Sequence, residues 1–340
     1  MKLRTYGALA PVLLLLCSAA AFADVASHRV AWRAQYKRPT VAVQYPKENP
    51  YTPQKAHLGK LLFFDPLLSG SRSRSCATCH IPSLSWTDGL SRALSDTQSA
   101  MPLHSPTLLN VGTVPILGWD GKFPSLEAVT FGPILASNNM NLTEAELIKR
   151  LSAIPGYVSA FEGAFGKDAI NRRNVERAVA TFERSIISGK APFDRWIEGD
   201  KKAISEQAKR GFDIFNGKAN CAACHSGWAF TDGSFHDIGS ATGDDVGRGQ
   251  FFPKSRLLRY AFKTPTLRDV ARRAPYMHDG SIANLAGVID LYDRGGIERP
   301  SRAAEIRPLS LTAAEKADLI AFLDTLTEDP KPFAVPTLPR

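Results

Sequence analysis

The stretch Cys221-Ala222-Ala223-Cys224-His225 decides how the chain is organised, and the same pattern occurs earlier as Cys76-Ala77-Thr78-Cys79-His80. Each copy has two thiols separated by two residues and followed directly by a histidine. This spacing lets the thiols bond to both vinyl groups of one porphyrin while the imidazole ligates its iron. The sequence therefore predicts two covalently attached c-type haems, held by Cys76, Cys79, Cys221 and Cys224, with His80 and His225 as iron ligands.

Other uses of these cysteine pairs fit the sequence less well. A structural zinc site would place its two pairs much closer together in the chain, and a redox-active CxxC pair has no need of a following histidine. The four thiols are also the only cysteines outside the first 23 residues. We therefore expect thioether bonds to haem instead of disulfides.

Residues 1–23 have the features of a secretory signal peptide. Lys2 and Arg4 precede an apolar run from Leu9 to Leu16, and a small-residue cleavage site ends at Ala23. The run is too short to span a membrane, and no later segment reaches the required length. Cys17 leaves a lipoprotein site as an alternative, which the bulky preceding residue disfavours. We predict export to the periplasm and no membrane span.

The charge of the chain is modestly basic. The formal net charge is +9, and removal of the signal peptide lowers it by two. Lysine and arginine do not form the clusters typical of a nucleic-acid-binding face, so we expect no nucleic-acid partner. The remaining basicity favours solubility and attraction to acidic protein partners.

The length and the two motifs predict two lobes. We expect an irregular N-terminal arm at 24–52, an N-terminal haem domain at 53–200, a C-terminal haem domain at 201–330 and a tail at 331–340. No β-type alternation competes with the helical patterns. The predicted fold class is mainly α, with two cytochrome c-like haem domains and long irregular loops.

Apolar spacing predicts the main helices. One covers 55–64 and ends at Asp65-Pro66, one begins at a capping box of Thr143 and Glu146, one covers 174–188, and a last one begins at a capping box of Thr312 and Glu315. The segments Gly59–Phe63 and Gly211–Phe215 each precede a CxxCH motif. This similarity predicts duplication of one unit, in which a helix and a glycine turn lead to the haem.

The second ligand of each iron decides the chemistry, because two protein ligands favour electron transfer and an open position favours peroxide or oxygen chemistry. Seven histidines are present, and most unassigned histidines are structural. A helix predicted after residue 284 places Leu285, Val288, Ile289 and Tyr292 on one face. Tyr292 is therefore either a core tyrosine or a phenolate ligand to iron.

A further set of motifs follows in a consistent order: Trp119-Asp120-Gly121, Gly132-Pro133-Ile134, Lys263-Thr264-Pro265-Thr266-Leu267-Arg268 and Pro275-Tyr276-Met277-His278-Asp279-Gly280. Together with the CxxCH motifs they resemble the bacterial dihaem cytochrome c peroxidase and MauG superfamily over residues 53–326. The resemblance implies that His80 holds the peroxide-reactive haem and that Trp119 relays electrons between the haems. Its ligand position on the second haem falls on Tyr292, as in the MauG branch, with Met277 as a rival.

The pocket expected opposite His80 departs from the family. By the resemblance, the distal glutamate position falls on Asn139 and the distal glutamine position on Val129, and only Pro133 is retained. An asparagine side chain cannot act as a general acid or base. Peroxide activation is therefore slower, uses another group, or is lost.

The resemblance also implies a calcium site between the haems, formed by an asparagine side chain and two carbonyls. Here His104 replaces that asparagine, and the carbonyls are those of Arg273 and Pro275. Imidazole is a poor calcium ligand, so calcium is an open cofactor prediction. His104 or Met140 is an alternative sixth ligand that would make the haem on His80 an electron carrier.

Three functions follow as hypotheses. The first is an exported MauG-like dihaem oxidoreductase that uses peroxide or oxygen to oxidise a protein partner. The second is a cytochrome c peroxidase that reduces hydrogen peroxide with electrons from a small cytochrome or cupredoxin. The third is a non-catalytic dihaem electron-transfer or redox-sensing protein, which the altered residues Val129 and Asn139 favour.

Overall fold

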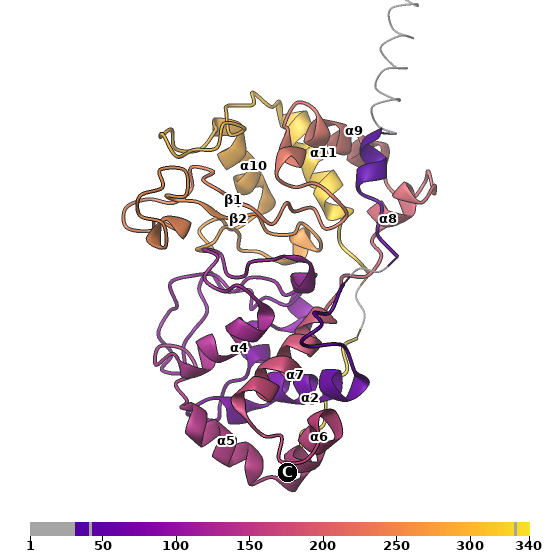
Figure 1. Cartoon of the computed structure of the whole chain (residues 1–340). Helices are drawn as coiled ribbons and strands as arrows, with labels where there is room; N and C mark the ends of the chain where they lie inside the picture. Colours follow the sequence, from indigo (N-terminus) through magenta and orange to yellow (C-terminus); the bar gives the residue numbers. More distant parts are fainter. Residues whose placement is uncertain (1–30, 41–42, 330–331) are drawn as a thin grey trace, which may run out of the picture.

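The computed structural model describes residues 31–40, 43–329 and 332–340, and it is mainly helical (Figure 1). The predicted signal peptide and Cys17 lie outside these residues. Two separate buried apolar clusters form the cores of two lobes. Within the described residues, no helix is long and apolar enough to cross a membrane.

The first lobe, at the bottom of Figure 1, is built around two helices that pack against each other, α2 (Pro53–Phe64) and α7 (Arg172–Arg184). Thr52 caps α2 by accepting a hydrogen bond from the Lys55 amide, and the helix ends at Asp65, as predicted. This lobe also contains α3 (Cys76–Cys79), α4 (Leu126–Leu135), α5 (Glu144–Ser152) and α6 (Pro155–Phe165).

The second lobe, at the top of Figure 1, is organised around α9 (Glu206–Asn216) and α11 (Ala313–Asp324). It also contains α8 (Pro192–Ile197) and α10 (Leu285–Arg294). A short antiparallel pair joins β1 (Phe235–His236) to β2 (Phe262–Lys263), with Phe235 opposite Lys263. Long irregular segments connect these elements, as the sequence predicts.

A glycine lies at the crossing point of the central helix pair in both lobes. A Cβ added to Gly59 of α2 would lie 1.9 Å from the Ala178 carbonyl oxygen of α7. A Cβ added to Gly211 of α9 would lie 2.0 Å from the Asp318 carbonyl oxygen of α11. Both backbones approach more closely than any side chain allows. This close helix crossing at a glycine, shared by both lobes, supports the predicted duplication of one unit.

The predicted helix ends are correct in part. Thr312 and Glu315 form the reciprocal capping box. Thr143 caps α5, but the Glu146 carboxylate bonds to Arg150 one turn later, so that box is half formed. The helix predicted to reach residue 188 ends at Arg184, where Ser185 caps it. The predicted glycine turn before the haem motif occurs after α9 at Gly217, whereas α2 ends at Asp65.

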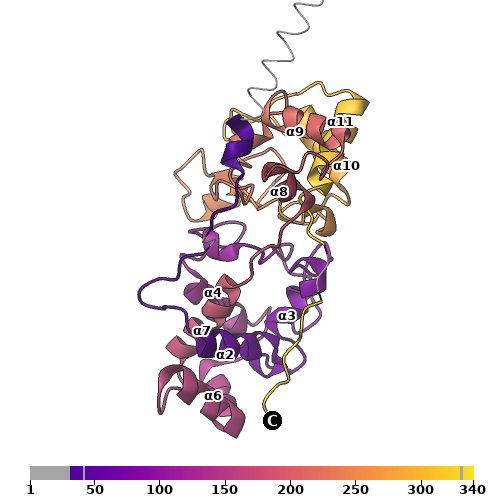
Figure 2. The ribbon, with the colours of Figure 1, turned by 90° about the vertical axis from the view of Figure 1, so that its right-hand side faces the viewer.

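Each end of the described chain packs against the lobe that is distant in sequence (Figures 1 and 2). The arm predicted to be irregular contains a helical segment at 31–35, and the Tyr36 ring stacks on Phe230 with centroids 4.7 Å apart. The tail returns to the first lobe, where the Phe333 ring stacks on Phe64. Aromatic burial explains both differences, because each ring completes an apolar cluster.

Helix α8, which precedes the predicted domain boundary at residue 200, packs against the second lobe. Phe193 and Trp196 of α8 belong to the core of the second lobe. A buried ion pair fixes this helix, because both guanidinium nitrogens of Arg268 donate to the Asp194 carboxylate, at 2.8 and 2.9 Å. Such bidentate pairing is geometrically specific, so α8 is held to the second lobe.

Candidate haem sites and the cavity between the lobes

The Cys221–His225 motif lies directly after α9. Gly217 ends the helix, Asn220 has a left-handed conformation with φ of 52°, and Cys221–Ala223 forms a single 3-10 turn. The His225 Nδ1–H donates to the Phe230 carbonyl at 3.0 Å. This bond selects the tautomer whose Nε2 carries a free lone pair. Burial lowers the pKa of His225, which favours the neutral imidazole that metals bind.

The Cys76–His80 motif has the same arrangement. Residues Cys76–Cys79 form the short helix α3, which begins at a capping box between Ser75 and Thr78. The His80 Nδ1–H donates to the Trp86 carbonyl at 3.2 Å, and burial lowers the pKa of His80. Both histidines are therefore prepared as neutral Nε2 ligands. The four motif cysteines are free thiols in this structure.

A cavity of about 250 Å³ lies between the lobes and extends beside the second motif. Its lining includes Cys221, Cys224, His225 and Tyr292 from the second lobe, and Trp119 from the first lobe. Most of the lining is apolar, which suits a porphyrin. His80 is not among the lining residues, so this cavity belongs to the second haem.

Tyr292 is held over this cavity by α10. Asn284 caps the start of the helix and Gly295 its end, so the side chain is carried by a regular element. The hydroxyl makes no hydrogen bond within the described residues, and burial raises the pKa of Tyr292. A polar group facing a cavity without a partner fits a ligand to a bound iron. Met277, the rival, borders the same cavity from a turn with φ of 77°.

Trp119 is fixed by both lobes. Its indole Nε1–H donates to the His104 carbonyl at 2.9 Å, and its own carbonyl accepts from the Lys263 amide at 2.7 Å. The following turn is held by Arg248, whose Nη1 lies 3.2 Å from the Asp120 carbonyl oxygen and 3.1 Å from that of Gly121. The geometry suits a side chain that must keep one position between two cofactors.

His104 is a buried structural residue at the same junction. Its Nδ1 lies 2.7 Å from the Leu90 carbonyl oxygen, and its amide donates to the His278 carbonyl at 2.8 Å. His104, Arg273 and Pro275, the residues that resemblance assigns to calcium, all border the cavity. The structure thus brings this set together and leaves calcium as a prediction.

The residues predicted for the distal pocket are placed by α4 and the turn after it. Val129 and Pro133 lie on α4, where Val129 packs against an apolar cluster of Leu117, Leu126 and Ala180. The Asn139 carbonyl accepts from the Asp96 amide at 2.7 Å. Met140 is 4% exposed in the first core, against which Cys76 also packs. None of these side chains supplies a carboxylate.

Three residues near the haem sites have charged side chains to which the sequence motifs assign no role. Glu183 of α7 is 6% exposed, and its Oε2 has no partner. Burial raises the pKa of Glu183 to about 8, and Glu127 adds a smaller effect in the same direction. Lys263 and Arg273 border the cavity between the lobes. Helical spacing marks position 183 as half-facing the core, but nothing in the sequence marks these charges as unpaired.

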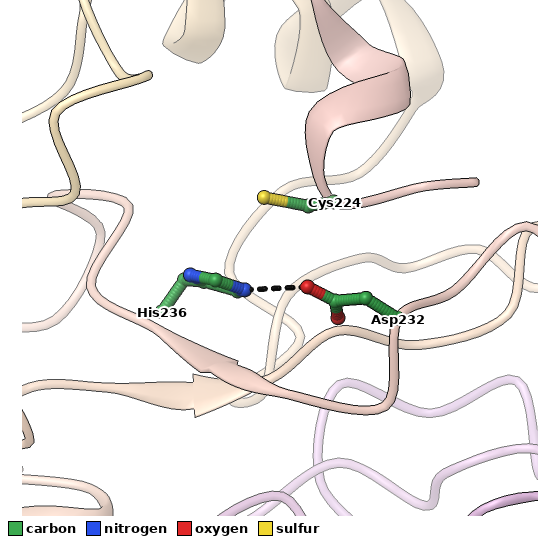
Figure 3. Close-up of side chains that lie close together, drawn as sticks. All are labelled: Cys224, Asp232 and His236. Atoms are coloured by element: carbon green, nitrogen blue, oxygen red, sulfur yellow. Dashed lines mark hydrogen bonds and ion pairs between the residues drawn. The ribbon is translucent and has the colours of Figure 1, made fainter.

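A cysteine, an aspartate and a histidine meet beside the second motif (Figure 3). The ligand atoms of Cys224, Asp232 and His236 all lie within 4.8 Å of one another, and His236 Nε2 is 2.7 Å from Asp232 Oδ2. The hydrogen bond to Asp232 is the main cause that raises the pKa of His236 to about 10. Because Cys224 is the predicted haem attachment, the trio is better described as a charged pair beside a thioether than as a metal site.

Two motifs that each fix an imidazole, one in each helical lobe with a tryptophan between the lobes, define a dihaem c-type cytochrome. Residues 53–202 match the family described as di-haem cytochrome c peroxidase, and residues 208–327 match the family described as cytochrome c. The chain belongs to the di-haem cytochrome c peroxidase and MauG family, whose members are oxidoreductases with two c-type haems.

The similar proteins include some named MauG and some named cytochrome c peroxidase. The chain is 49% identical to the methylamine utilization protein MauG of Methylorubrum extorquens, over 95% of this chain and 93% of that protein. It is 36% identical to the cytochrome-c peroxidase IdrP1 of a Pseudomonas species, over 88% of each. The structure of a MauG-like protein associated with microbial copper homeostasis superposes with a TM-score of 0.80 at 29% identity, covering 87% of this chain and 94% of that one.

Proposed function

We propose that the chain is an exported dihaem oxidoreductase of the MauG type, which uses hydrogen peroxide or oxygen to oxidise a protein partner. The observation that carries this proposal is the position of Tyr292, whose unbonded hydroxyl shares a cavity with His225, Cys221 and Cys224. An anionic phenolate on the iron stabilises its oxidised states. With His225 and Tyr292 both as ligands, the second haem would have no open position for peroxide and would supply storage of oxidising equivalents.

When bound, the haems supply iron that exchanges electrons and, where a position is open, reacts with peroxide. The protein contributes fixed ligands and a fixed path. His80 and His225 are held as neutral Nε2 donors by carbonyls. Trp119 is bonded to both lobes and borders the second haem's cavity, so it offers an aromatic step between the two cofactors.

The electron balance defines what the partner must supply. Reduction of one hydrogen peroxide to two waters consumes two electrons and two protons. In the proposed reaction both electrons come from side chains of the protein partner and leave it oxidised. The basic net charge of the chain favours an acidic partner surface.

The test of the proposed ligand is Tyr292→Phe, with Tyr276→Phe as the matched control. Tyr276 borders the same cavity, but its hydroxyl donates to the Val270 carbonyl at 3.0 Å. The Tyr292→Phe variant should lose the low-spin ferric signal of the second haem in electron paramagnetic resonance, and the control should keep it. An unchanged spectrum in Tyr292→Phe refutes the ligation.

A cytochrome c peroxidase is the second candidate, because the similar proteins include one with that name at 36% identity. In that case the two electrons come from a reduced small cytochrome or cupredoxin. Mixing the protein with peroxide and a reduced small cytochrome separates the two functions. Rapid stoichiometric oxidation of the cytochrome supports the peroxidase, and oxidation of protein side chains without it supports the MauG type.

The third candidate is a non-catalytic electron carrier or redox sensor. Val129 packs in an apolar cluster, and Asn139 supplies no acid, so the predicted distal positions offer no proton donor. The ferric protein should respond to a small excess of peroxide with a lasting absorbance change if it is an enzyme. An unchanged spectrum favours the electron carrier.

A further inference from the structure

Two cations, one buried and one half-buried, border the cavity between the lobes and have no anionic partner among the described residues. They are Arg273, which follows the turn at Val270–Arg272, and Lys263 of β2. The chain places them in the same cavity as the second CxxCH motif. Neither residue is needed for iron ligation or for the thioether bonds.

The Arg273 guanidinium is almost fully buried, but not all of its nitrogens have a hydrogen-bond partner. The residue is 8% exposed, its Nη2 donates to the Thr266 carbonyl, and its Nε has no partner. The nearest acidic influence is Asp269, but that carboxylate accepts hydrogen bonds from Ser85 and from the Glu328 amide. Burial lowers the pKa of Arg273 to about 10, so it remains charged at neutral pH.

Lys263 is fixed by its backbone, while its ammonium group is free. Its amide donates to the Trp119 carbonyl at 2.7 Å, and Lys263 pairs with Phe235 across the short sheet. No ion pair or side-chain hydrogen bond engages the ammonium group within the described residues. Burial alone lowers the pKa of Lys263 to about 8.

Burying a cation without a counter-charge is costly, and natural proteins pair such groups. Among the residues that border the cavity, Glu305 is the only carboxylate, and it is exposed and makes no ion pair with either cation. Within the described part of the chain, the two positive charges are therefore unmatched. A c-type haem attached at Cys221 and Cys224 brings two propionate groups, which equal the cations in number and are opposite to them in charge.

We propose that Arg273 and Lys263 bind the propionates of the haem attached at Cys221 and Cys224. Arg273 presents a planar fork suited to a carboxylate, and Lys263, whose amide binds the Trp119 carbonyl, presents a point charge. These residues are positioning residues for the cofactor. The proposal requires the haem alone and is independent of the proposed peroxide chemistry.

The pairing has an electrostatic consequence for the iron. A cation near a haem stabilises the ferrous form relative to the ferric form, which has one more positive charge. Arg273 already influences the electrostatics of His225 in this way, because it is among the charges that lower the pKa of His225. The two cations therefore raise the reduction potential, and the proposed Tyr292 phenolate lowers it.

The experiment is a redox titration of the purified dihaem protein, followed by the absorbance of the second haem, without peroxide or partner. The variants are Arg273→Gln and Lys263→Met. The matched control is Arg272→Gln, because Arg272 is the exposed neighbour of Arg273. Arg273→Lys retains the charge and tests the role of the fork.

Arg273→Gln and Lys263→Met should each shift the reduction equilibrium toward ferric haem by about tenfold, or 59 mV for one electron. Arg272→Gln should leave the potential unchanged. Arg273→Lys should have a potential much closer to that of the unaltered protein than Arg273→Gln has. Infrared difference spectra with isotope-labelled propionates should show displaced carboxylate bands in both neutral variants. Unchanged potentials and bands in either variant overturn the role of that residue.

The proposal can be tested even if one variant folds poorly. If Arg273→Gln fails to incorporate the second haem, Lys263→Met and the charge-retaining Arg273→Lys decide the outcome by the same titration. Because peroxide is absent, an inactive enzyme still reports the potential. A shifted potential supports the propionate pairing even if a separate assay finds no reaction with peroxide, and that second result refutes the proposed function.

Discussion

The indole nitrogen of Trp119 lies 2.9 Å from the carbonyl oxygen of His104, so the tryptophan between the lobes is oriented by a backbone hydrogen bond from its own lobe. Its carbonyl is bound in turn by Lys263 of the other lobe, at 2.7 Å. The ring therefore has little freedom to move when the lobes shift.

Replacing Trp119 by Phe should slow the transfer of electrons between the haems while the fold is kept. Phenylalanine removes both the easily oxidised indole and the Nε1–H bond, and it fills most of the same space. Stopped-flow absorbance after peroxide addition should show at least a tenfold slower response of the second haem. Trp228→Phe is the control, because that half-buried ring packs on Arg38 and does not border the cavity. Equal rates in both variants would show that Trp119 is only a packing residue.

Gly211→Ala should strongly destabilise the second lobe. Its Cβ would lie 2.0 Å from the Asp318 carbonyl oxygen, and backbone must move to accept it. Overpacking of this kind costs about 1–3 kcal/mol or more. Chemical denaturation followed by circular dichroism measures the loss.

Gly163→Ala is the matched control for this prediction. Gly163 also lies within a helix, but a Cβ there meets nothing within 4 Å. Helix propensity should then stabilise this variant by about 0.5–1 kcal/mol. Similar effects of the two substitutions would contradict the close crossing of α9 and α11.

Stability should fall as the pH rises from about 5 to 8 because of Glu183. Burial raises the pKa of Glu183 from 4.5 to about 8, so the folded chain keeps a proton that the unfolded chain releases. The unfolded state therefore gains up to about 1.4 kcal/mol for each pH unit in this window. Glu127 and Arg184, which face Glu183, modify the effect in opposite directions.

Glu183→Gln should flatten this pH dependence and leave stability near pH 5 almost unchanged, as measured by guanidinium titration at several pH values. Glu176→Gln on the same helix is the control, because Glu176 pairs with Arg172 near the surface. A slope that persists in Glu183→Gln would assign the pH dependence to another group.

Calcium removal should have no effect on the haem spectra. The position assigned to a ligand by resemblance is His104, and the neighbouring Arg273 adds a buried positive charge to the same cavity. Both features disfavour a second cation. Dialysis against a calcium chelator, with magnesium or calcium added back, is the measurement. A spectral change that only calcium reverses would establish the site.

The sequence was sufficient where the signal is local. The CxxCH spacing predicted two c-type haems, as the family has, and the apolar face from Leu285 to Tyr292 predicted α10. Helix ends were predicted less accurately. Helix α7 ends at Arg184, because the amides of Ser185 and Ile186 donate to carbonyls in its last turn. The roles of Trp119, Tyr292, Val129, Pro133 and Asn139 came from resemblance and stay predictions.

Long-range packing was beyond the sequence. No local sequence pattern predicts that Tyr36 stacks on Phe230 or that Phe333 stacks on Phe64. The unpaired state of Arg273 and Glu183 depends on which groups surround them in three dimensions. Such features become visible only when distant segments are brought together.

The crossed ends of the chain have a consequence for how the protein matures. The first lobe receives Phe333 only after the last residues have been made, and the second lobe needs Tyr36 from the beginning of the chain. The first lobe therefore cannot complete its core during synthesis of its own segment, whereas Tyr36 is already present when the second lobe is made. The first lobe is expected to remain open until the whole polypeptide is available, which leaves Cys76 and Cys79 accessible to the machinery that attaches haem.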